Sequence, residues 1–231
     1  MKTRDLPVIL ILVAIFAPFF LSEDLYSFYS RFNSEHGFIM SFIKFAVLAT
    51  YGEILGLRIR TGSYNMKGFG LAPRMMVWGI LGLAIKAAFM VYSSGAPAVL
   101  SYLGMNDPGA ILTGPFSAGR VLVAFCISLF LNLTFSPVLM TFHRITDAHI
   151  ARHNGRLACL VNKINVKSTL ATMDWGTHWG FILKKTIPFF WIPAHTLTFL
   201  LPADFQILFA AFLGVVLGVI LAFAAGSKTV D

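Results

Sequence analysis

The sequence predicts an all-α integral membrane protein: one bundle of about six transmembrane helices with a short interfacial helix. Of the 231 residues, 57% are hydrophobic and only 12% are charged, and the mean hydropathy is +0.77. The run from Phe205 to Ala225 contains no charged residue. At about 1.5 Å per residue it is long enough to cross the hydrocarbon layer of a bilayer, about 30 Å thick. A water-soluble domain of this size needs more charge on its surface, so we expect residues 1–231 to form a single transmembrane domain.

Six apolar runs are separated by polar or glycine-rich segments. The first run follows Lys2 and Arg4, as in a signal peptide, but no small-x-small cleavage pattern follows Leu21, so we expect this run to be retained as a span. The expected spans cover about residues 6–21, 37–57, 75–92, 120–141, 179–201 and 205–225.

The fifth run is unusual because it contains prolines. Pro188 and Pro193 each lack a backbone donor and clash with the preceding turn, so we expect a kinked helix there. A hinge at residues 201–204 then leads into the last span.

The polar segment before the fifth run carries an amphipathic pattern. Its apolar residues fall at helical spacing between basic ones, which predicts a short helix on the membrane surface. These residues are Leu157, Leu160, Val161 and Ile164.

The basic residues predict the orientation in the membrane. Six spans place both termini on one side, and that side collects nearly all Lys and Arg of the loops, which indicates the cytoplasm. Only Arg31 and Arg120 fall outside. The net charge of +8 therefore indicates contact with the lipid bilayer and its anionic headgroups, and no nucleic acid is expected as a partner. A bacterial cytoplasmic (inner) membrane is the simplest location, and an organelle membrane is the alternative.

Two small-residue motifs predict close helix packing. Gly52 and Gly56 lie in the second span, and Gly214 and Gly218 lie in the sixth. Glycines four residues apart let neighbouring backbones approach closely. We expect packing within the bundle, with a homo-oligomer contact as the alternative.

Ionisable residues inside the spans provide the candidate functional site. Lys44, Lys86 and His195 fall at a similar depth, six or seven residues from the outer end of their spans, which is about 10 Å by helix rise. Charges inside a membrane mostly face a bundle interior or a watery cavity, so these residues are candidates for a solute pathway. The alternative is that both lysines extend to the outer interface and the histidine fills space beside the proline kink.

Glu53 lies near the inner end of the second span. Arg58 and Arg60 follow it, and Arg74 begins the next span. A structural ion pair is the favoured interpretation, and a gate or proton site on the solute pathway is the alternative.

The sequence offers little that indicates catalysis. His149 and His153 share one helical face near Asp147, but no third ligand follows at suitable spacing, so no metal site is expected. Cys126 and Cys159 are expected to be free thiols. No phosphate-binding glycine loop, serine nucleophile motif or paired cysteine motif is present, so we expect neither an enzyme nor a cofactor. An enzyme acting on lipid is a third, more distant reading.

The last part of the chain resembles the Mpv-seventeen/PMP-twenty-two family of small mitochondrial and peroxisomal membrane proteins, as a bacterial-type relative. The matching residues are Trp191, Pro193, Phe199 and Pro202, followed by an apolar final helix. Weaker similarities lie at Gly52-Glu53 and at Arg74. The resemblance covers about residues 37–225 and implies a channel-like or solute-passing protein with no catalytic residue.

The sequence thus predicts a multi-pass membrane protein that acts as a channel or transporter for small solutes, with anions favoured by the lysines. The alternative is a non-transporting scaffold or assembly factor whose basic cytoplasmic loops bind lipid headgroups or a partner. A water-accessible cavity that reaches Lys44 favours transport, and a filled bundle favours the scaffold.

Overall fold

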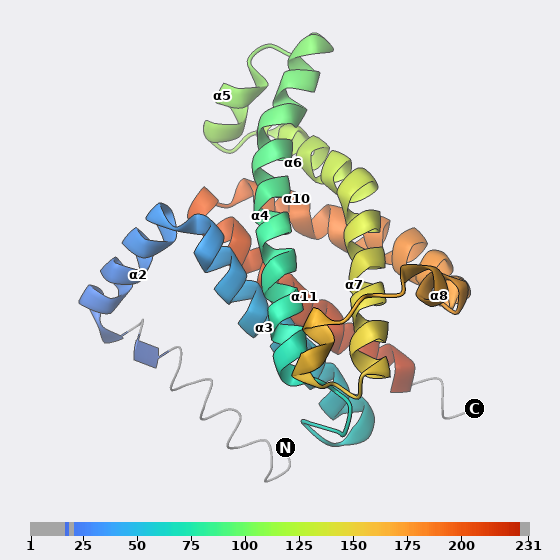
Figure 1. The fold of residues 1–231 in the computed structure, drawn as a ribbon. Coiled ribbons are helices and arrows are strands. Elements are labelled where there is room, and N and C mark those ends of the chain that lie inside the picture. The colour runs from blue at the N-terminus through green and yellow to red at the C-terminus, as the bar shows by residue number, and fades with distance from the viewer. Residues whose placement is uncertain (1–16, 19–20, 227–231) are drawn as a thin grey trace.

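The computed structural model describes residues 17–18 and 21–226, and over these residues it is helical and contains no strand (Figure 1). The predicted all-α class is confirmed. Within the part of the chain that the structure describes, four helical segments are long and apolar enough to cross a membrane: Gly37–Thr61, Leu71–Tyr102, Ala118–Arg152 and Ala203–Ile220. The predicted first span, residues 6–21, lies almost entirely outside the described residues.

The second predicted span is helix α3, Gly37–Thr61, which follows α2, Glu23–Glu35. Helix α3 ends where Gly62 takes a left-handed conformation with φ 75°, and the amide of Gly62 bonds back to the carbonyl of Arg58. Arg58 and Arg60 lie in the last turn, where positive charge is favourable beside the unpaired carbonyls.

The third span is longer than predicted. Helix α4, Leu71–Tyr102, runs ten residues past the expected end and includes Pro97. Glycine and proline favour an irregular segment there, but Ala96 and Pro97 are buried, and Ala96 belongs to the main apolar core with Val123 of α6. Tertiary packing therefore overrides the local preference. A short helix α5, Pro108–Thr113, follows.

The fourth span forms one continuous helical segment made of α6, Ala118–Phe130, the π-helical turn η2, Leu131–Phe135, and α7, Ser136–Arg152. Pro137 cannot donate a backbone hydrogen bond, and the wide turn lies directly before it. The helix continues eleven residues beyond its predicted end at Thr141. Residues 142–152 are therefore helical, although their charges suggested a loop.

The predicted interfacial helix is replaced by shorter elements. Residues Leu157–Val161 form a 3₁₀ turn, η3, and helix α8, Val166–Ala171, follows after an extended link. Cys159 in η3 is buried against Val77 and Ile150, and His149 hydrogen-bonds to its carbonyl at 2.9 Å. These contacts hold the turn under α4 and α7. Leu157, Leu160 and Val161 are exposed, as an interfacial segment requires, but they lie on a 3₁₀ turn and not on the predicted helix.

The predicted fifth span is helical throughout, but it is not among the four segments that are long and apolar enough to cross a membrane. A single turn α9, Trp175–Thr177, leads into the π-helix η4, His178–Trp191, and then into α10, Ile192–Leu200. Pro188 lies inside η4 and Pro193 at the start of α10, so both prolines lie in or beside a stretch of wide helical winding. The kink expected there stays a prediction.

The η4–α10 segment runs antiparallel to α6–α7. Thr141 contacts His178 at 3.0 Å, Ser128 donates to the carbonyl of Ile192 at 2.7 Å, and Arg120 donates to the carbonyl of Leu200 at 3.0 Å. Helix α11, Ala203–Gly226, then folds back along α3 (Figure 1).

The two glycine motifs pack against each other across the α3–α11 interface. A Cβ atom built on Gly52 would lie 2.8 Å from the Cα of Val215, and one built on Gly218 would lie 3.0 Å from the carbonyl oxygen of Gly52. The two motifs therefore pack within one bundle, which is the arrangement that the sequence favours. The alternative contact between copies of the chain stays a prediction.

Candidate solute cavity

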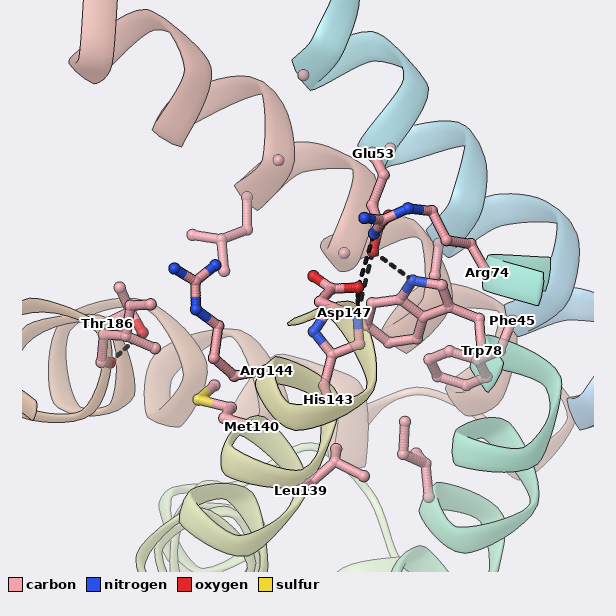
Figure 2. Close-up of a pocket in the computed structure, with 18 of the residues that line it drawn as sticks. Phe45, Glu53, Arg74, Trp78, Leu139, Met140, His143, Arg144, Asp147 and Thr186 are labelled. Atoms are coloured by element: carbon pink, nitrogen blue, oxygen red, sulfur yellow. Dashed lines mark hydrogen bonds and ion pairs between the residues drawn. The ribbon is translucent and has the colours of Figure 1, made fainter. Parts of the chain in front are cut away.

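A cavity of about 730 Å³ lies between α3, α4, α7, η4, α10 and α11 (Figure 2). Phe45 and Arg60 both line it and lie about 22 Å apart along α3, at about 1.5 Å per residue. The glycines of the α3–α11 interface also belong to its lining. The predicted bundle is therefore not filled, and an elongated, partly open space lies between its helices.

One wall of the cavity carries a charged network of Glu53, Arg74, Trp78, His143 and Asp147. Arg74 donates from Nη1 to a carboxylate oxygen of Glu53 and to Oδ1 of Asp147, the latter at 2.6 Å. Trp78 donates from Nε1 to Oε1 of Glu53 at 2.7 Å, and His143 Nε2 lies 3.0 Å from the same oxygen. Figure 2 shows these side chains converging from α3, α4 and α7.

The same arginine also holds the loop that precedes its helix. Arg74 donates from Nε to the carbonyl of Phe69 at 2.7 Å, and its guanidinium lies 4.8 Å from the centre of the Phe69 ring. Two of its three nitrogens, Nε and Nη1, therefore donate to partners on the loop, α3 and α7. The network therefore fixes three helices and one loop relative to each other.

Three further cations line the cavity without an acidic partner among the described residues: Arg60, Lys67 and Arg144. Arg144 extends from α7 into the space between the charged network and Thr186 of η4 (Figure 2). Both carboxylates on the cavity wall, those of Glu53 and Asp147, already contact Arg74. The cavity consequently has an excess of positive charge.

The other end of the cavity is apolar. It is lined mainly by Phe45, Ala49, Ile85, Leu131, Phe135 and Ala210. Phe89 lies at this end, its ring 4.9 Å from that of Phe199 and edge-on to His195 at 5.7 Å.

A buried hydrogen-bonded group supports the apolar end. Asn132, fully buried in η2, donates to the carbonyl of Ser128 at 2.8 Å, accepts from the hydroxyl of Ser136 at 2.9 Å and lies 3.0 Å from Nδ1 of His195. The π-helical turn places the amide where it reaches α10. His195 is therefore held in place by α6–α7.

Two polar atoms of lining residues have no hydrogen-bond partner among the described residues: Nδ1 of His178 and Nε1 of Trp191. Buried polar atoms are normally paired.

The structure divides the predicted pathway residues between two places. Glu53 and His195 line the main cavity, Glu53 in the charged network and His195 at the apolar end. Lys86 lines a separate cavity of about 280 Å³ that also includes Asn33 and Asp204. Lys44 is buried and donates to Oδ1 of Asn33 at 2.5 Å, so it points toward α2 and is not part of the main cavity's lining.

Glu53, His143 and Asp147 present ligand atoms within 4.8 Å of one another, close enough for one metal ion. The guanidinium of Arg74 contacts both carboxylates and so takes the place that a cation would need. His149 and His153, the other metal candidates, are engaged with the carbonyls of Cys159 and His149. The charged network therefore fits a structural ion-pair group better than a metal centre.

The sequence interpretation missed the partners of Glu53 on α7. His143 and Asp147 are four residues apart and so lie on one face of a helix, a signal that a helical reading of residues 142–152 contains. From the sequence, Arg144 is expected only as one of the basic residues of the cytoplasmic loops.

No protein-family model, curated protein or solved structure matches the chain.

Proposed function

We propose that the chain is a multi-pass membrane protein that passes small anionic solutes through the cavity, as a channel or a transporter. One observation carries the proposal: Arg144 extends into the cavity, and no acidic side chain of the described residues pairs with it (Figure 2). Arg144 is exposed and so is accessible to a solute, and ionisable residues that line a space within a membrane bundle commonly mark ion or substrate pathways.

The charges around the cavity favour anions over cations. Its lining has four positive charges, those of Arg60, Lys67, Arg74 and Arg144, against the two carboxylates of Glu53 and Asp147, which leaves an excess of two positive charges. A positive, low-dielectric space raises the local concentration of anions. A cation would meet repulsion and no free carboxylate on the wall.

The proposal keeps the six-span orientation, with both termini and the basic loops in the cytoplasm. The basic half of the cavity then faces the cytoplasm, and the apolar end lies nearer the outer surface. Phe89 and the His195 side chain occupy that end. Passage requires this end to open, and the π-helical η4 with its proline is the element best suited to move.

Membership of the Mpv-seventeen/PMP-twenty-two family and a location in a bacterial inner membrane are part of the same proposal.

A scaffold function is the second candidate. Arg156, Lys163 and Lys167 are exposed around η3 and α8 and do not line the cavity. Such a basic surface suits anionic lipid headgroups. The cavity does not reach Lys44, so the predicted route past that lysine does not support transport. A scaffold nevertheless has no need of a cavity lined by Arg144, which is why transport is preferred.

Conductance of the purified protein in planar bilayers tests the choice. Wild type is compared with Arg144→Gln and with Lys163→Gln, which removes an exposed charge outside the cavity. We expect anion-selective currents that fall in the first variant and persist in the second. Lys86→Ala tests whether the route continues through the second cavity, which Lys86 lines. Silent bilayers with folded, inserted protein would favour the scaffold.

A further inference from the structure

The shape of the cavity restricts the class of anion. The charged residues of its lining are unevenly distributed along its length: Arg60, Lys67 and Arg144 belong to one half, and the other half, with Phe45, Ile85 and Phe89, has no charged side chain. On α3 alone this separation extends over about 22 Å between Phe45 and Arg60.

A fully hydrated anion fits only the basic half. In the apolar half it would lose its water without enough hydrogen-bond donors in return, which is unfavourable. The polar side chains there are largely engaged, because Ser136 donates to Asn132 and Nδ1 of His195 contacts the same amide. The unpartnered Nε1 of Trp191 is one remaining donor.

A hydrocarbon chain fits the apolar half. Such a chain needs no polar partner, and its burial against aromatic and aliphatic side chains is favourable. A cavity of about 730 Å³ is within the usual range for a small-molecule site, roughly 300–1,000 Å³.

The headgroup of such a molecule has a matching partner in the basic half. Arg144 offers a planar donor group suited to two oxygens of a carboxylate or phosphate. It lies beside His178, whose buried ring has an unpartnered Nδ1. Glu53 and Asp147 do not repel the headgroup strongly, because Arg74 already contacts both.

We infer that the cavity binds a single-chain anionic amphiphile, with its carboxylate or phosphate at Arg144 and its tail extending toward Phe89 and Trp191. This inference rests on the proposed function and names the substrate class of the same site.

The test uses the full chain in nanodiscs of zwitterionic lipid, with dodecanoate that carries a bromine at the end of its chain. Bromine quenches tryptophan fluorescence on contact. We expect saturable quenching that Trp191→Phe largely removes. The dissociation constant should rise about tenfold in Arg144→Gln, the equivalent of one charge-assisted contact, and stay unchanged in Lys163→Gln.

Two competitors define the ligand class. Dodecanoate without bromine should reverse the quenching, whereas dodecanol, which lacks the charge, and acetate, which lacks the tail, should not. Phosphate recognition is examined with a dodecyl phosphate competitor. Displacement by dodecyl phosphate and dodecanoate alike supports a general anionic headgroup site.

The inference and the proposed function fail in different ways. Quenching that does not saturate, or that is equal in Arg144→Gln and wild type, overturns the amphiphile site even where the bilayer currents are intact. Saturable quenching that depends on Arg144, together with silent bilayers, supports the site and overturns transport.

Discussion

Arg74 joins three helices through a single nitrogen. From α4, its Nη1 donates to Glu53 on α3 and to Asp147 on α7, 73 residues further along the chain. Both carboxylates are at most about one-fifth exposed. The charged wall of the cavity is consequently also the main polar connection of the bundle.

Removing the Arg74 charge should destabilise the protein. Arg74→Gln leaves two partly buried carboxylates without their cation, and breaking a buried ion pair from one side costs about 3–5 kcal/mol. We expect a clearly lower thermal unfolding temperature, which is measured by the intrinsic fluorescence of the protein in detergent. Arg60→Gln, which removes a cavity cation without an acidic partner, is the matched control.

A second substitution should restore part of that loss. Glu53→Gln in the Arg74→Gln background removes one of the two uncompensated charges. The double variant should therefore be more stable than the sum of the single changes implies. Additive losses would show that Arg74 does not act through Glu53.

The α3–α11 interface should tolerate a methyl group at one glycine and not at another. A Cβ on Gly52 would meet backbone of α11 at 2.8 Å, whereas a Cβ on Gly214 would meet nothing within 4 Å. Gly52→Ala should lower the unfolding temperature, and Gly214→Ala should leave it unchanged or raise it, since alanine favours helix. Equal effects of the two changes would exclude the close approach described above.

The buried amide of Asn132 should matter for stability. Asn132→Ala removes the contacts to His195 and Ser136 and leaves buried polar groups unpaired, at a cost of about 1–3 kcal/mol. Thermal unfolding should report this loss. Asn65→Ala, in the exposed loop before α4, should have no effect, and a similar drop in both variants would contradict the role of η2.

Cys159 should be unreactive in the folded protein. Its side chain is almost fully buried, and burial raises the pKa of its thiol, so little thiolate forms at pH 7 to 8. In a Cys126→Ser background, a water-soluble maleimide should label the protein slowly and then rapidly once the detergent is exchanged for SDS. Rapid labelling of the folded protein would show that η3 is not packed under α4 and α7.

The sequence was sufficient for those features that depend on composition and local pattern. The all-α class, the spans that start at Gly37 and near Ala203, and the proximity of Glu53 to Arg74 follow from apolar runs and from charges at adjacent helix ends. The extension of α7 to Arg152 was missed because residues 143–152 are polar on one face. That face lines a cavity inside the bundle and so can hold charge.

The placement of the candidate site could not be read from depth alone. Lys44 and His195 lie at similar expected depths, but Lys44 points toward Asn33 of α2 and His195 toward Asn132. Depth in a span does not specify which face a side chain takes. A cavity depends on how several helices pack, and only the tertiary structure contains that information.

Selective blocking of the cavity tests the central claim most directly. In a Cys126→Ser, Cys159→Ala background, Met140→Cys places a thiol on the cavity wall, while Val166→Cys places one on α8 at a site that is 46% exposed and outside both the lining and the candidate spans. Both variants are treated with a water-soluble methanethiosulfonate, and anion flux into proteoliposomes is measured. We expect modification of Met140→Cys to stop the flux and modification of Val166→Cys to leave it unchanged. Full flux after complete modification at position 140 would contradict this claim.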